Sequence, residues 1–247
     1  MRADLLDAQA ALEWAEAQIP LLQQAFIDWQ RANPYPVVQE PHPDGAGDVA
    51  VVYDQPFPLT FNAWVGAIVG SLRSSLDLLA AALAKRNGKN PSADTHFPIY
   101  RSLHDFIDPL TGIESKKWLS DRERAAIKAF EPYNGGDDPL WFLHRLDIAR
   151  KHERLISVRP ETTRYFMVGR RIEVGGARVL ERLENKTILF RLVPGERLSA
   201  TQGNTLLTVF VTFNETTLGL ADYEVTNILR IFTVRVTAIL QAIDELG

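Results

Sequence analysis

Apolar residues at alternating steps of three and four predict a long amphipathic helix at the beginning of the chain. The residues on this face are Leu5, Ala8, Leu12, Ala15, Ile19, Leu22, Phe26 and Trp29. Pro20 lies inside the pattern, and because proline lacks an amide hydrogen it should kink the helix or divide it in two. Asn33, Pro34 and Pro36 then end the helix.

Two short β-prone runs follow and predict a hairpin. The first is Val37 and Val38, and the second covers residues 49–53. Residues 42–45 between them read His-Pro-Asp-Gly, which is typical turn chemistry.

Residues 61–84 are almost wholly apolar or small, and the segment is long enough to cross a bilayer. Arg73 and Asp77 lie at its centre, where a single membrane span would carry a large penalty. Their spacing of four lets them pair along one helix face, which favours a buried helix of a soluble bundle. A second face, made of Gly66, Gly70, Ser74 and Ala81, would let another helix approach closely.

The second half of the chain changes from helical to β character. Ser120 predicts the cap of a helix over residues 121–130, and Asp138 with Pro139 predicts the start of the next. Strands are expected at residues 165–168, 187–193 and 206–213, followed by a final amphipathic helix from Val225 to Leu246.

These elements predict an α+β fold, a bundle of long helices with an antiparallel sheet packed on one side or end. The chain has no repeat and no low-complexity linker, so a single domain over residues 1–247 is expected. Its helical part would cover about 1–156 and 220–247, and its β part about 157–215.

Composition narrows the function classes only slightly. Hydrophobic residues make up 46% and charged residues 23%, with a net charge of −4, so no general coating of nucleic acid or membrane is indicated. The absence of cysteine excludes disulfides and thiolate sites, and it fits a reducing compartment. The first residues lack the apolar core of a signal peptide, so we expect a cytoplasmic protein without a membrane partner.

The helix predicted over residues 140–156 carries the least ordinary polar residues. On a helical wheel, apolar residues from Trp141 to Ile156 fill one arc, and Arg145 and His152 fall inside it. The opposite arc, expected to face solvent, holds Asp147, Arg150, Lys151 and Arg154.

Two interpretations of this pair remain open. In one, Arg145 is buried and pairs with Asp77, while His152 is a core histidine with one hydrogen bond. In the other, both line a cleft where Arg145 holds an anionic group and His152 exchanges protons. Residues 144–171 hold eight Lys or Arg and three acids, which fits a phosphate- or RNA-binding patch or a solvated charged face.

No cofactor or metal site is expected. The five histidines show no tight ligand spacing, and His144 with Asp147 offers two ligands without a third. The sequence also lacks a phosphate-cradling glycine loop, a dinucleotide fingerprint and a serine-nucleophile elbow.

An ordered series of motifs between residues 64 and 158 resembles a group of uncharacterised bacterial proteins. Residues 71–77, SLRSSLD, resemble the group's LRSALDHLA signature, and the later FPI, EPY and KHER runs resemble its FPI, QPY and DKHR elements. Leu78 stands where the group often has His, and Glu153 where Arg is common. The resemblance singles out Arg73, Asp77, Asp147, Lys151 and His152, and it implies no activity.

Arg145 and His152, with six residues between them, are also similar to the paired Arg and His of HEPN domains. These are helical bundles whose ribonucleases carry both residues on one helix. That resemblance implies metal-independent RNA cleavage at a homodimer interface. His152 would move the proton of the ribose hydroxyl and Arg145 would stabilise the phosphorane. Apart from this resemblance, the candidate binding residues of the chain are Arg73, Asp77, His144, Asp147, Lys151 and Arg154.

The sequence therefore leaves two hypotheses. The first is a HEPN-like ribonuclease or RNA-binding factor of the defence or toxin type, with Arg145 and His152 as catalytic residues. The second is a non-catalytic helical interaction module, in which Arg73, Asp77, Arg145 and His152 form a buried network that fixes the register of the helices. An open cleft that holds both Arg145 and His152 would favour the first.

Overall fold

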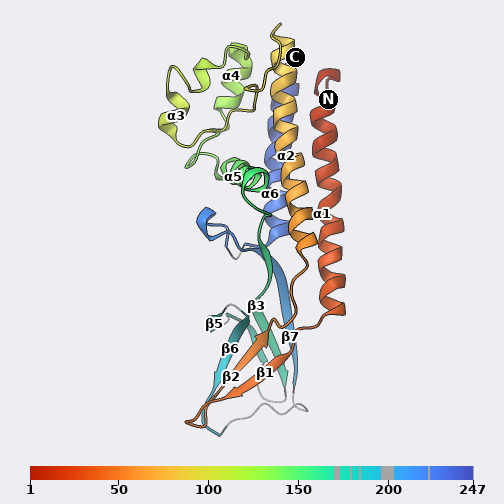
Figure 1. Ribbon diagram of the computed structural model, residues 1–247, viewed down its shortest axis with the longest axis vertical. Helices are drawn as coiled ribbons and strands as arrows, with labels where there is room; N and C mark the ends of the chain where they lie inside the picture. The colour runs from red at the N-terminus through yellow and green to blue at the C-terminus, as the bar shows by residue number, and fades with distance from the viewer. Residues whose placement is uncertain (170–172, 179, 184, 196–202, 222, 247) are drawn as a thin grey trace.

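The computed structural model describes residues 1–169, 173–178, 180–183, 185–195, 203–221 and 223–246. Three long helices lie side by side at one end of an elongated molecule, and the strands form the other end (Figure 1). The helices are α1 (Leu6–Ala32), α2 (Leu59–Arg86) and α6 (Val225–Asp244). The predicted α+β class, a helical bundle with antiparallel sheet at one end, is confirmed.

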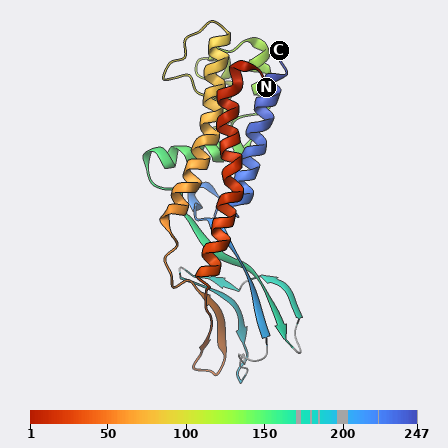
Figure 2. The ribbon, with the colours of Figure 1, turned by 90° about the vertical axis from the view of Figure 1, so that its right-hand side faces the viewer.

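The first helix packs as its apolar pattern predicts. A short 3-10 turn, η1 (Ala3–Leu5), precedes α1, which lies against α2 and α6 (Figure 2). Two serines of α2 donate hydrogen bonds to carbonyl oxygens of α1, Ser71 to Ala11 at 2.8 Å and Ser75 to Ala8 at 2.7 Å. Pro20 is exposed and α1 continues through it, so the helix is not divided.

Helix α2 supplies much of the bundle core. Leu72, Leu76 and Leu79 are fully buried, together with phenylalanines such as Phe232 of α6. By length and composition α2 and α6 could each cross a membrane. Of the most apolar stretch of α2, 61% is buried inside the molecule, and of that of α6, 44%. Core helices of soluble proteins can be equally long and apolar, so this is weak evidence for a membrane span.

The strands form two antiparallel sheets. One has the order β1-β2-β6-β5 and the other the order β4-β3-β7. Val49, Val51 and Leu189 of the first sheet form a small separate core with Tyr35. The strand bounds are β1 Val37–Pro41, β2 Gly47–Val52, β3 Val158–Gly169, β4 Glu173–Arg178, β5 Glu181–Arg182, β6 Lys186–Leu192 and β7 Gly203–Phe213.

The predicted hairpin exists, but the expected bounds of the β part are wrong. β1 and β2 pair through the turn at residues 42–46, and β2 then pairs with β6, so that Val49 lies opposite Phe190. The β part therefore includes residues 37–52 as well as the region after residue 157. Sequence periodicity predicted parts of β1, β2, β3, β6 and β7 but not β4 or β5, and it carried no information about this long-range pairing.

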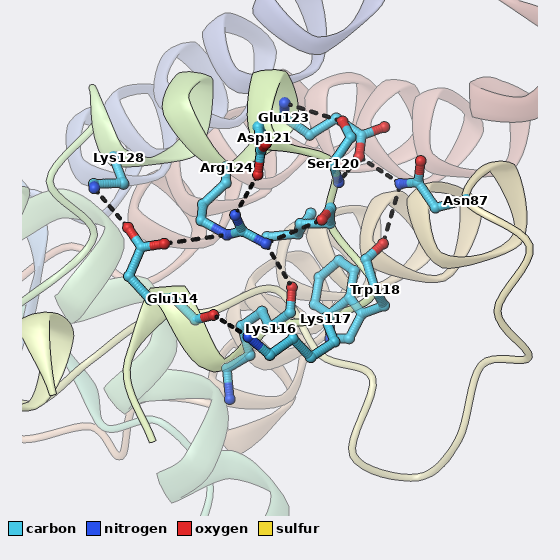
Figure 3. Close-up of polar contacts among 11 residues, drawn as sticks. Asn87, Glu114, Lys116, Lys117, Trp118, Ser120, Asp121, Glu123, Arg124 and Lys128 are labelled. Atoms are coloured by element: carbon cyan, nitrogen blue, oxygen red, sulfur yellow. Dashed lines mark hydrogen bonds and ion pairs between the residues drawn. The ribbon is translucent and has the colours of Figure 1, made fainter. Parts of the chain in front are cut away.

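A polar network fixes the segment between α2 and the later helices (Figure 3). This segment holds α3 (Leu103–Ile107), η2 (Ile113–Ser115) and α4 (Asp121–Lys128). Ser120 and Glu123 form the capping box that begins α4, as its sequence predicts. The buried carboxylate of Glu123 also accepts a hydrogen bond from Asn87, at the end of α2, at 2.6 Å. The network thus anchors α4 to the end of the bundle.

Candidate functional site

Helix α5 (Asp138–His152) crosses the bundle beside α2 and α6 (Figure 2). Its N-cap is Asp137, one residue before the predicted cap, and the Asp137 carboxylate accepts a hydrogen bond from the Leu140 amide at 3.1 Å. The other carboxylate oxygen lies 2.7 Å from Nε of Arg235 in α6. This buried carboxylate therefore fixes the beginning of α5 to α6.

The buried side of α5 differs from the predicted one. Leu140, Leu143 and Leu146 are fully buried, and Asp147 is only 3% exposed. The prediction that Asp147 faces solvent is therefore wrong. A carboxylate can occupy this position because two cations reach it from the next turn of the same helix.

The prediction that Arg145 and His152 both face the core is also wrong. Arg145 is half-buried, and His152 is exposed together with its neighbours in residues 151–155. Residues at this end are exposed all round the helix because the last turn of α5 extends past α2 (Figure 2). A helical wheel assumes that one face is buried along the whole length, and α5 does not meet that condition.

A cluster of charged residues lies where α5 passes α2, and we call it the crossing cluster. Asp147 is its centre: one carboxylate oxygen accepts a hydrogen bond from Nη2 of Arg150 at 2.7 Å, and the other lies 2.7 Å from Nζ of Lys151. The members of the crossing cluster are Arg73 and Asp77 of α2 and His144, Asp147, Arg150 and Lys151 of α5.

Arg73 is the most buried cation of the crossing cluster, at 4% exposed. Its Nη2 forms an ion pair with Oδ1 of Asp77 at 2.9 Å and donates a hydrogen bond to the carbonyl of Phe97 at 3.0 Å. Asp77 accepts a further hydrogen bond from the Phe97 amide at 3.0 Å. Burial lowers the pKa of Arg73, while the charges of Asp77 and Asp147 oppose that change. The predicted pairing of Arg73 with Asp77 is thus confirmed, and the alternative pairing of Asp77 with Arg145 is wrong.

Two buried nitrogens of the crossing cluster have no hydrogen-bond partner within the described part of the chain. They are Nη1 of Arg73 and Nδ1 of His144. Burial, reinforced by the positive charge of Arg73, lowers the pKa of His144 to about 4. His144 is therefore neutral at pH 7, and a neutral imidazole can remain beside a buried guanidinium without repulsion.

Two glycines of α2 leave the space that Arg150 occupies. A Cβ at Gly70 would lie 2.5 Å from Nη2 of Arg150, and a Cβ at Gly66 would lie 3.1 Å from its Cδ. The small-residue face predicted for this helix therefore does admit another helix, which is α5. Gly70 lets the guanidinium of Arg150 lie against α2 while it holds Asp147.

We expect Gly70→Ala to lower the free energy of unfolding by about 1 kcal/mol, because the new methyl group displaces Arg150 from Asp147. In an Arg150→Ala background the same change should instead stabilise the protein, since alanine favours a helix over glycine by about 1 kcal/mol. Urea denaturation of the four proteins of this cycle measures both effects. Equal effects of Gly70→Ala in the two backgrounds would show that the contact is unimportant.

Arg154 also has a structural partner. Both of its terminal nitrogens donate to the carboxylate of Glu215, each at 2.7 Å, and Glu215 accepts a third hydrogen bond from the Ser157 amide at 2.8 Å. Glu215 is 1% exposed and comes directly before η3 (Thr216–Leu218). The predicted binding residue Arg154 thus fastens η3 to the end of α5.

An open cleft of about 660 Å³ lies along the first half of α5. It is bounded by the aromatic rings at the start of α5, by Arg145 one turn later, by η3, and by two loop residues. Its lining residues are Arg101, Asn134, Trp141, Phe142, Arg145, Thr217 and Leu218. Its volume lies within the usual range for small-ligand sites.

Backbone contacts bring the two loop residues of the cleft together. Tyr100 and Tyr133 form an isolated parallel bridge, in which the Tyr100 amide donates to the Pro132 carbonyl at 2.8 Å. The amide of Asn134 donates to the Tyr100 carbonyl at 3.2 Å. Arg101 and Asn134, each next to this bridge, therefore lie at the same wall of the cleft.

The cleft arginines have no acidic partner among the residues that the structure describes. The guanidinium of Arg145 lies 5.8 Å from the ring centroid of Trp141, and none of the described lining residues is an acid. Other arginines are neutralised, as Arg150 is by Asp147 and Arg154 by Glu215. Two unpaired guanidinium groups in one cleft form a local positive site on a protein of net charge −4.

The predicted site residues thus fall into three places. Arg73, Asp77, His144, Asp147 and Lys151 belong to the crossing cluster, and Arg145 lines the cleft. Arg154 and His152 lie at the end of α5, outside both. Sequence reasoning missed the other cleft residues, although a tryptophan four residues before Arg145 was a usable signal for a cation–π contact. The missed residues are Arg101, Asn134, Trp141, Phe142, Thr217 and Leu218.

Comparison with known proteins does not assign the chain to a family. No family model, no curated protein and no solved structure matches the chain.

Proposed function

We propose that this protein is a non-catalytic RNA-binding factor of the cytoplasm whose cleft holds phosphate groups of the strand. The observation that carries the proposal is the pair of guanidinium groups, Arg101 and Arg145, that line one cleft without an acidic partner among the described residues. Guanidinium presents a fork of N–H donors that matches phosphate oxygens. The side-chain amide of Asn134 and the hydroxyl of Thr217 add neutral donors to the same cleft.

The lining of the cleft argues against the ribonuclease hypothesis. Cleavage through the ribose hydroxyl needs a group that exchanges a proton near neutral pH. None of the described lining residues is a histidine or a carboxylate, and His152 lies on the exposed end of α5. Arg145 alone can bind or stabilise a phosphate, but it has no proton-transfer partner within the cleft.

The crossing cluster supports the structural role that the second hypothesis gave to buried polar residues. Arg73, Asp77 and Asp147 are held by the contacts between α2 and α5. Arg145 and His152 are not members of this network, contrary to that hypothesis. The crossing cluster fixes the path of α5 across the bundle, and the cleft lies on the part of α5 that this contact positions.

We expect Arg101→Ala and Arg145→Ala each to weaken the binding of single-stranded RNA about tenfold, which corresponds to one lost charge-assisted phosphate contact. Anisotropy of a fluorescent RNA of mixed sequence, measured at several salt concentrations, tests this. Each substitution should also reduce the slope of log K against log salt by about 0.7, because one fewer counterion is released.

Arg122→Ala is the matched control, since Arg122 is an exposed arginine on α4 outside the cleft. It should leave RNA binding unchanged. The same proteins, together with His152→Ala, are incubated with RNA to measure cleavage. Cleavage by the unmodified protein that is lost in both Arg145→Ala and His152→Ala would overturn the non-catalytic proposal in favour of a ribonuclease. Equal RNA binding by Arg122→Ala, Arg101→Ala and Arg145→Ala would overturn the binding site.

A further inference from the structure

The aromatic side of the cleft is not explained by phosphate binding alone. Trp141 and Phe142 both border the open space, and both rings are only partly buried. Aromatic side chains of this size usually lie in a core or at a binding surface, because exposing them to water is unfavourable. Two adjacent half-buried rings beside two unpaired guanidinium groups therefore suit a ligand that is both flat and anionic.

The ring of Trp141 has two close neighbours on α5. The imidazole of His144 lies 6.0 Å from the indole centroid, tilted by 48°, and the guanidinium of Arg145 lies 5.8 Å from it. His144 in turn is half-buried and belongs to the crossing cluster. These neighbours restrict the positions open to the indole, and a restricted ring loses less conformational freedom when a ligand stacks on it.

We infer that the cleft binds an unpaired nucleobase together with its phosphate, and so selects single-stranded over double-stranded RNA. This inference rests on the proposed function. Bases stack on aromatic rings and on guanidinium planes, and both surfaces are present in the cleft. In a duplex the base faces are covered by the adjacent base pairs, so a duplex offers only its phosphates to Arg101 and Arg145.

The test uses the unmodified protein first. Its affinity is measured by anisotropy for a single-stranded RNA, for the same strand with abasic positions, and for a duplex of equal phosphate number. We expect the single strand to bind about tenfold more tightly than either the abasic strand or the duplex. Adenosine monophosphate and ribose 5-phosphate, which lacks a base, are then tested as competitors of the single-stranded RNA. Displacement of the RNA by adenosine monophosphate alone, at a concentration similar to that of the RNA, would identify a free nucleotide rather than a strand as the ligand.

Substitutions then test whether Trp141 produces the preference for single-stranded RNA. Trp141→Ala should bring single-strand affinity down to the abasic level, while Trp141→Phe should retain most of the preference because it keeps an aromatic face. Trp14→Ala is the control, because Trp14 is a 44% exposed tryptophan on α1, outside the cleft. It should leave every affinity unchanged.

The outcomes separate this inference from the proposed function. Equal affinity of the unmodified protein for the single strand, the abasic strand and the duplex would overturn base recognition. If Arg101→Ala and Arg145→Ala still weaken binding in that case, phosphate binding by the cleft stands. No binding of any RNA would overturn both. Because the comparison of ligands needs no variant, a Trp141 variant that fails to fold leaves the test intact.

Discussion

Asp147→Ala is expected to lower the free energy of unfolding by about 3 kcal/mol. The carboxylate is 3% exposed and its charge acts on three cations, Arg73, Arg150 and Lys151. Removing it leaves Arg73 buried with Asp77 as its remaining acid, and a buried charge without enough compensation is costly. For a chain of this length the change corresponds to a fall in Tm of roughly 6 to 12 °C.

Asp28→Ala provides the matched control. Asp28 also pairs with an arginine three residues later, Arg31, but the two side chains are 61% and 75% exposed and their charged atoms lie 3.7 Å apart. Exposed pairs of this kind contribute little, so Tm should remain almost unchanged. Asp147→Asn should fall between the two variants, because it keeps an acceptor oxygen and loses the charge. Thermal unfolding followed by circular dichroism measures all three, and similar Tm values for Asp147→Ala and Asp28→Ala would contradict the burial argument.

The long helices were predictable because each satisfies a local condition. The steps of three and four in α1 and α6 place their apolar residues on one face, and both helices bury that face along most of their length. The hairpin of β1 and β2 was predictable from its turn residues for the same reason. Its pairing with β6 joins residues 47–52 to residues 186–192, and no local pattern carries that information.

The orientation of α5 was not predictable from a wheel. The predicted apolar arc, from Trp141 to Ile156, left out Leu140 and Leu143, which lie on the other side of the helix and are fully buried. The rings of Trp141 and Phe142 border the cleft, while the smaller Leu140 and Leu143 fill the core. The side that is buried is determined by the tertiary contacts of α5, with α2 through the space left by Gly66 and Gly70 and with α6 through Asp137.

The residues of the cleft could be predicted only in part. Arg145 could be singled out because it breaks an apolar pattern on its own helix. Arg101 lies in a loop that carries no such pattern, and the bridge between Tyr100 and Tyr133 brings it to the cleft from more than thirty residues away in the chain. Asn134 reaches the same wall through that bridge. The charge of the site therefore depends on a tertiary contact.

Acid is expected to destabilise the protein through His144 before it affects most of the carboxylates. Burial lowers the pKa of His144 from its ordinary value of 6.5 to about 4, with Arg73, Arg145 and Lys151 adding repulsion and Asp147 opposing it. The unfolded chain therefore binds a proton at a higher pH than the folded chain does. Stability contributed by the neutral ring is complete above pH 6.5 and is lost as the pH falls from about 6.5 towards 4.

The magnitude follows from the same linkage. Each pH unit between the two pKa values contributes at most about 1.4 kcal/mol per proton, and partial exposure of the ring reduces the total to about 2 kcal/mol. Asp48 and Asp108 have lowered pKa values in the folded protein. The stability that they contribute is lost only as the pH approaches the ordinary aspartate pKa of 3.8 and falls below it. Burial raises the pKa of the Asp137 carboxyl, which acts in the opposite direction as the pH falls. The contribution of His144 is therefore obtained from the difference between two proteins that share Asp137.

His144→Gln isolates this effect, because glutamine is neutral at every pH and the carboxylates are the same in both proteins. Urea denaturation at pH 7.0, 6.0, 5.0 and 4.5 gives the free energy of unfolding of each. We expect the difference between the unmodified protein and His144→Gln to shrink by roughly 2 kcal/mol on going from pH 7.0 to 4.5. Parallel pH profiles would show that the ring is protonated as easily in the folded state as in the unfolded one. In that case the crossing cluster does not hold His144 neutral.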